Sequence, residues 1–122
     1  MRSHEDLDVW RSGIDLVDRV YDLCRSLPVD ERFGLISQLQ RASVSVPANI
    51  AEGCGRDSTK DLLRHLAIAQ GSLAEARTLL VIVRRRGFAK AAEVDEVDTL
   101  AQSVARMLVG LQRAMRRKLD SQ

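Results

Sequence analysis

Apolar residues recur three or four positions apart along four stretches of the chain, at residues 6–26, 31–54, 59–86 and 91–119. This spacing places side chains on one face of an α-helix, and no segment shows the two-residue alternation of a β-strand. The four stretches have comparable lengths and short connections. The pattern therefore predicts an all-α fold, an up-down-up-down four-helix bundle that forms a single domain over residues 1–122.

Pro47 lies inside the second stretch. A proline within a helix removes one backbone hydrogen bond and costs about 3 kcal/mol if nothing compensates. The apolar spacing nevertheless continues on both sides of it, from Ile36 to Ile50. We therefore expect one continuous second helix with a proline kink, rather than two short helices.

Glycines and a capping sequence mark the helix ends. Gly53 and Gly55 can adopt the left-handed conformation that ends a helix, and Gly87 is placed to end the third helix. Ser58 and Asp61 form a capping box that starts the third helix. The boundary between the second and third helices is therefore the clearest in the chain.

Gly13, Gly71 and Gly110 lie inside predicted helices. Each costs about 1 kcal/mol relative to alanine at such a position. We expect close approach of neighbouring helices to compensate for this cost. A ligand-binding role for these glycines is the alternative.

The first predicted helix has two adjacent apolar stripes. One consists of Leu7, Trp10, Ile14, Val17, Tyr21 and Cys24, and the other of Leu16, Val20, Leu23 and Leu27. Their combined width exceeds what one partner helix needs, which indicates either deep burial or a subunit contact. If the second stripe faces a neighbouring subunit, Leu16, Val20 and Leu23 form the oligomer interface.

The composition is that of an ordinary globular protein, with 45% hydrophobic and 30% charged residues and a net charge of +2. There are only four aromatic residues, so surfaces that stack on nucleic-acid bases are scarce. The amino terminus has no apolar signal segment, and the longest unbroken aliphatic run, residues 79–83, is far too short to span a membrane. We expect a cytoplasmic protein with no membrane partner, whose two cysteines lie at opposite ends of the bundle as reduced thiols.

Motifs for catalysis or metal binding are missing from the sequence. It contains no Cys-x-x-Cys, no His-x-x-x-His and no Glu-x-x-His pair, and its Gly-Cys-Gly-Arg segment at residues 53–56 lacks the lysine of a phosphate-binding loop. We therefore expect no metal, no cofactor and no enzymatic activity.

A polar group beside the predicted kink is a candidate site. Asn49, Glu52 and Arg56 recur on one face of the second helix. We expect them to form a structural hydrogen-bond network with the third helix through Ser72 or Glu75, because a buried carboxylate needs a partner. A ligand-binding or catalytic role for this face is the alternative.

Charge is unevenly distributed along the chain, with an acidic first helix and a basic third helix. Two basic clusters follow, Arg84, Arg85 and Arg86 at the end of the third helix, and Arg113, Arg116, Arg117 and Lys118 at the end of the fourth. Cations at helix carboxyl termini complement the helix dipole, so a structural role competes with nucleic-acid binding. In an up-down bundle the two clusters lie at opposite ends.

Several segments together resemble a known family. They are residues 6–10 (DLDVW), 33–39 (FGLISQL), 45–53 (SVPANIAEG) and 68–73 (IAQGSL). These resemble the four-helix-bundle family of 23S rRNA intervening-sequence proteins, which is related to the accessory variability determinant of diversity-generating retroelements. The resemblance implies a protomer that assembles into a ring of five, a nucleic-acid-binding role and no catalysis. In the fourth helix, only the apolar spacing matches.

These observations lead to two functional hypotheses. The first is a non-enzymatic oligomer, a homopentamer by the resemblance, that binds RNA or DNA through the arginine-rich clusters without strong sequence selectivity. The second is a structural or protein-interaction module with no nucleic-acid role.

Overall fold

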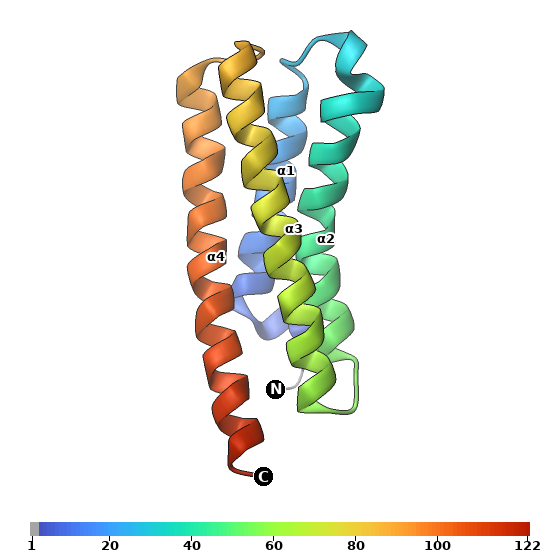
Figure 1. Cartoon of the computed structure of the whole chain (residues 1–122), viewed down its shortest axis with the longest axis vertical. Coiled ribbons are helices and arrows are strands. Elements are labelled where there is room, and N and C mark those ends of the chain that lie inside the picture. The colour runs from blue at the N-terminus through green and yellow to red at the C-terminus, as the bar shows by residue number, and fades with distance from the viewer. Residues whose placement is uncertain (1–2) are drawn as a thin grey trace.

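Four long antiparallel helices form the molecule (Figure 1). They are α1 (Asp8–Cys24), α2 (Ser37–Cys54), α3 (Thr59–Arg86) and α4 (Ala91–Asp120). The computed structural model describes residues 3–122. Each helix packs against the next along the chain, and α1 also packs against α4, which closes the bundle. The predicted all-α four-helix bundle is confirmed.

Aliphatic side chains from all four helices form the core. The largest fully buried ones are Leu16, Val20, Leu39, Val46, Ile50, Leu66, Leu73, Leu80, Val83, Val104 and Leu108. Their spacing of three, four or seven residues within each helix produces one inward apolar face per helix. A continuous aliphatic core of this kind is the main source of stability for the bundle.

Leu16, Val20 and Leu23 lie in this core, with 1%, 0% and 3% of their surface exposed. The prediction that they form an oligomer interface is therefore wrong, because a neighbouring subunit cannot reach them. The middle of the other stripe lies outward instead, with Ile14 38% and Tyr21 45% exposed, whereas Cys24 at its end is buried and Leu7 and Trp10 at its start pack against the core. Both stripes have helical spacing, so spacing alone does not determine which one faces the core.

The start of α2 differs from the prediction. Two short elements, η2 (Val29–Glu31) and η3 (Arg32–Ile36), precede α2, which begins at Ser37 rather than at residue 31. Within η3, Gly34 has non-helical dihedral angles, φ −108° and ψ −109°. The Glu31 carboxylate accepts a hydrogen bond of 3.4 Å from the backbone amide of Leu35. Gly34 thus separates a capped turn from the regular helix.

The ends of α3 follow the predicted signals. The Ser58 hydroxyl accepts a hydrogen bond from the backbone amide of Asp61 at 3.0 Å, which caps the first turn. At the other end, Gly87 has φ +67°, the left-handed conformation that ends many helices. The residues between these two signals form one helix of 28 residues.

Gly53 and Gly55 do not adopt the predicted left-handed conformation, since Gly55 has φ −82° and Gly87 alone has a positive φ among the described residues. Gly53 instead allows close packing of α2 on α3. A Cβ at Gly53 would lie 2.8 Å from the Cβ of His65 and 2.9 Å from Cδ1 of Leu62. The residue is therefore required for its small size.

The helix α2 continues through Pro47, as the apolar spacing predicts, while the kink itself stays a prediction. Pro47 is buried against α1, where a Cβ at Gly13 would lie 3.4 Å from the Pro47 Cβ. Close approach of helices is thus confirmed for Gly13. The same expectation is wrong for Gly71 and Gly110, because a Cβ at either position would meet no atom within 4 Å.

Candidate nucleic-acid interface

The two basic clusters lie at opposite ends of the bundle, as predicted. In Figure 1 the residues at the end of α3 lie at the upper end, beside the start of α4. The end of α4 lies at the lower end, near the turn between α2 and α3. There, Lys118 lines a shallow cavity together with Arg56 and Asp57.

The α3 cluster is engaged within the protomer. Arg84 forms an ion pair with Asp95 of α4. The guanidinium of Arg86 lies 5.7 Å from the centre of the Phe88 ring, within range of a cation–π interaction. Of this cluster, only Arg85 has no such partner in the described part of the chain. The cluster is therefore partly neutralised.

The α4 cluster has no such partners. Arg113, Arg116, Arg117 and Lys118 are all exposed, and within residues 3–122 none of their side chains forms a hydrogen bond, an ion pair or a ring contact. Arg106, about two turns before Arg113 on the same helix face, is also exposed and without an ion pair in that range. The outer face of this half of α4 is thus an unneutralised basic surface.

The acidic first half of α4 is bound to neighbouring helices. The Arg77 guanidinium of α3 donates two hydrogen bonds to the Asp98 carboxylate, at 2.9 and 3.2 Å. This hydrogen bonding holds the pKa of Asp98 below its ordinary value. On the other side, Arg19 of α1 donates to Glu96 at 3.3 Å. These contacts fix α4 against α3 and α1.

The predicted polar network exists in a different form. The Ser72 hydroxyl of α3 donates to the Ser45 hydroxyl of α2 at 2.8 Å, and the Asn49 side-chain amide donates to the same Ser45 oxygen at 2.9 Å. The Asn49 carbonyl oxygen lies 3.1 Å from Nδ1 of His65, which is 4% exposed. Asn49 and Ser72 therefore connect α2 to α3 as predicted, through Ser45 and His65, which the prediction did not include.

The prediction is wrong for Glu52, Arg56 and Glu75. Glu52 of α2 and Arg56 in the turn that follows form an exposed ion pair of 2.9 Å, and within the described residues neither side chain forms a hydrogen bond or ion pair with α3. Glu75 is exposed and has no partner among the described residues. The sequence does indicate that His65 lies next to the apolar face of α3, because His65 follows Leu62 by three residues.

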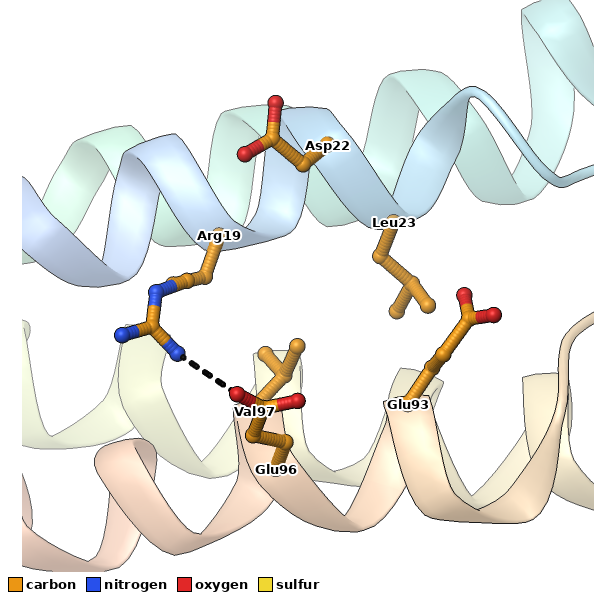
Figure 2. Close-up of a pocket in the computed structure, with 6 residues that line it drawn as sticks. All are labelled: Arg19, Asp22, Leu23, Glu93, Glu96 and Val97. Atoms are coloured by element: carbon orange, nitrogen blue, oxygen red, sulfur yellow. Dashed lines mark hydrogen bonds and ion pairs between the residues drawn. The ribbon is translucent and has the colours of Figure 1, made fainter.

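A pocket lies between the upper halves of α1 and α4 (Figure 2). It is lined by Arg19, Asp22, Leu23, Glu93, Glu96 and Val97. Within the described residues, no group of three or more His, Cys, Asp or Glu side chains converges as a metal site would require.

Neither cysteine has the features of a nucleophile. Burial raises the pKa of the Cys24 thiol to about 11, so it stays protonated at neutral pH. Burial also raises the pKa of the half-buried Cys54. No disulfide joins Cys24 to Cys54 within the described residues.

Helix α3 is long and apolar enough to span a membrane by length and composition alone. Its buried residues, among them Leu66, Leu73 and Leu80, face the core of the bundle. The core helix of a bundle meets the same criterion, so length and composition alone do not make α3 a membrane span.

Comparison with known proteins agrees with this architecture. No curated protein sequence matches the chain. Among solved structures, the chain is similar to the 1.70 Å crystal structure of a protein with unknown function from the S23 ribosomal protein family of Bacteroides thetaiotaomicron VPI-5482. The two share 22% sequence identity and a TM-score of 0.79, over 85% of this chain and 97% of that one, which indicates the same fold. A family model described as 23S rRNA-intervening sequence protein matches residues 5–110, and the chain therefore belongs to this family.

Proposed function

We propose that this protein is a non-enzymatic, self-associating bundle that binds RNA or DNA backbones through the second half of α4. The observation that carries this proposal is the run of exposed cations at the end of α4 with no ion-pair partner in the described chain, Arg116, Arg117 and Lys118. Phosphate contacts by arginine and lysine supply most of the affinity of sequence-independent nucleic-acid binding.

The position of these cations suits a phosphate backbone. Arg116, Arg117 and Lys118 are consecutive exposed residues near the carboxyl-terminal end of α4. Guanidinium groups bind phosphate with two parallel hydrogen bonds, so each of the two arginines can hold one phosphate of a strand.

The family description adds support, because it associates these proteins with 23S rRNA genes. The match ends at residue 110, however, so Arg113, Arg116, Arg117 and Lys118 lie beyond it. The proposed interface therefore depends on residues of this chain rather than on the family.

The small number of exposed aromatic side chains favours backbone binding over base recognition. Tyr21 and Phe33 are exposed, but they lie on α1 and in η3, outside α4. Stacking on aromatic side chains is the usual way to bind unpaired bases. We therefore expect binding to depend strongly on salt and only weakly on sequence.

The test compares two variants that each remove three positive charges from the end of a helix. One carries Arg116→Gln, Arg117→Gln and Lys118→Gln, and the matched control carries Arg84→Gln, Arg85→Gln and Arg86→Gln. Affinity for a fluorescent RNA hairpin and for duplex DNA is measured by anisotropy at low salt. We expect the α4 variant to lose at least about tenfold in affinity, and the control to bind like the unmodified protein.

Equal losses in both variants would show a non-specific charge effect and contradict the assignment to α4. No binding by the unmodified protein at low salt would contradict the nucleic-acid role. The interaction-module function would then be favoured, because Ile14, Tyr21 and Val109 leave apolar surface exposed on α1 and α4.

A further inference from the structure

The pocket in Figure 2 has an excess of negative charge. Glu93 and Glu96 extend from α4, Asp22 lies on α1 with its carboxylate pointing away from α4, and Arg19 is the one cation among the lining residues. Arg19 is bound to Glu96 at 3.3 Å, so Glu93 and Asp22 are left with weak contacts. The Glu93 carboxylate accepts a long hydrogen bond of 3.5 Å from Ser26, and Asp22 lies 4.0 Å from Arg25.

The pocket is also partly apolar, since Leu23 and Val97 form part of its lining. An apolar wall beside carboxylates suits an arginine side chain, which combines a methylene stem with a charged head. A guanidinium can also form two hydrogen bonds with one carboxylate. The pocket therefore has the chemistry of an arginine-binding site.

A groove with the opposite charge lies further along α4. It is lined by Ala105, Arg106, Val109, Gly110 and Arg113. A Cβ at Gly110 would meet no atom within 4 Å, so nothing in the protomer compensates for a glycine in the middle of a helix. Val109 is 37% exposed, and the two arginines have no ion-pair partner within residues 3–122.

These two surfaces cannot meet within one chain. Glu96 and Arg113 are 17 residues apart on the same helix, a distance of about 25 Å along its axis. An arginine side chain reaches only a fraction of that distance. The pocket and the groove can therefore meet only between two copies.

We propose that the acidic pocket between α1 and α4 of one copy binds Arg106 and Arg113 from the α4 groove of a second copy of this chain. The small Gly110 lets the helix surface of the second copy approach closely, and Val109 then covers the apolar wall of the pocket. This inference rests on the self-association in the proposed function and specifies its surfaces. The pocket and the groove, rather than the buried stripe of α1, then form the oligomer interface.

Two charge-reversed variants test this contact. The groove variant carries Arg106→Glu and Arg113→Glu, and the pocket variant carries Glu93→Lys and Glu96→Lys. In the first, pocket and groove are both acidic, and in the second, both are basic. Each variant alone should therefore show an association at least about 100-fold weaker than that of the unmodified protein, because like charges meet at the contact.

An equimolar mixture of the two variants should associate again, because the pocket of each now faces a groove of opposite charge. Association is measured without RNA by sedimentation velocity over micromolar to submillimolar concentrations, and circular dichroism confirms that each variant is folded. A matched control with Lys60→Glu and Arg85→Glu, which reverses two exposed cations outside both surfaces, should associate like the unmodified protein.

The proposal is overturned if the unmodified protein is monomeric throughout, if either variant alone associates normally, or if the mixture stays monomeric. RNA binding by the same unmodified protein is measured separately. RNA binding without self-association would refute the contact and leave the nucleic-acid role. Self-association without RNA binding would refute the nucleic-acid role and leave the contact.

Discussion

The two halves of α4 carry opposite charges and have opposite relations to the rest of the bundle. Residues 91–105 contain four carboxylates and no cation, whereas residues 106–120 contain five cations and one carboxylate. In the first half, Asp95, Glu96 and Asp98 all pair with arginines of α1 or α3. In the second half, none of the five cations has such a partner in the described chain.

Both halves contribute to the core, with Val97 and Ala101 buried in the first and Leu108 in the second. Apolar packing therefore does not distinguish them. The difference lies on the outer surface, where three of the four carboxylates of the first half pair with arginines inside the protomer, Glu93 being the exception, and the five cations of the second half are left to solvent. Charges that remain unpaired in a folded chain are available to a partner, so the comparison separates structural charges from candidate binding charges.

The largest expected effect is on the free energy of unfolding, when alanine replaces either of two glycines. Gly53→Ala should lower the free energy of unfolding by about 1–3 kcal/mol, because its Cβ would collide with His65 and Leu62. Gly110→Ala on the basic half should raise it by about 0.5–1 kcal/mol, because the site is open. Urea unfolding at low protein concentration measures both. A destabilising Gly110→Ala would show that the groove is packed and contradict the comparison.

The next effect concerns the ion pair between α3 and the acidic half. Asp98→Asn should lower the free energy of unfolding by about 1 kcal/mol, since it weakens two hydrogen bonds from the half-buried Arg77. Arg113→Gln on the basic half should leave the stability unchanged. Thermal unfolding of both variants tests the difference. Equal shifts in melting temperature would remove the distinction between the two halves.

A smaller effect should appear in acid. The pKa of Asp98 is lower in the folded protein than its ordinary value of 3.8, so its contribution to stability is fully present above about pH 5. That contribution is lost as the pH falls through the ordinary value towards the lowered one. The stability difference between the unmodified protein and Asp98→Asn should therefore shrink below about pH 4. A constant difference down to about pH 2 would contradict this assignment.

Periodicity was sufficient to predict the helices, because each needs an apolar face. The end signals at Ser58 and Gly87 located α3 to the residue. The apolar pattern does not predict the start of α2, because that start depends on the backbone conformation of Gly34, and glycine permits many dihedral angles. The apolar pattern does not predict the rotation of α1 either, because its two apolar stripes have the same spacing and only packing against α2 and α4 selects between them.

The candidate sites were harder to predict, because they depend on contacts between helices. The basic cluster of α4 is visible in the sequence, whereas the pairing of Arg84 with Asp95 depends on the turn between α3 and α4. Likewise, the contact of Ser45 with Ser72 requires the relative rotation of α2 and α3. Sequence spacing specifies the face of a helix, and the fold specifies what that face meets.

The salt dependence of RNA affinity tests the central claim, that the unpaired cations of α4 bind nucleic-acid backbone. The logarithm of the binding constant is plotted against the logarithm of salt concentration for the Arg116→Gln, Arg117→Gln, Lys118→Gln variant and for its α3 control. Each lost phosphate contact reduces the slope by about 0.7–0.9, so the α4 variant should lose about 2–3 units of slope, and the control about none. Slopes that are equal in the two variants, or reduced only in the α3 control, would contradict the account.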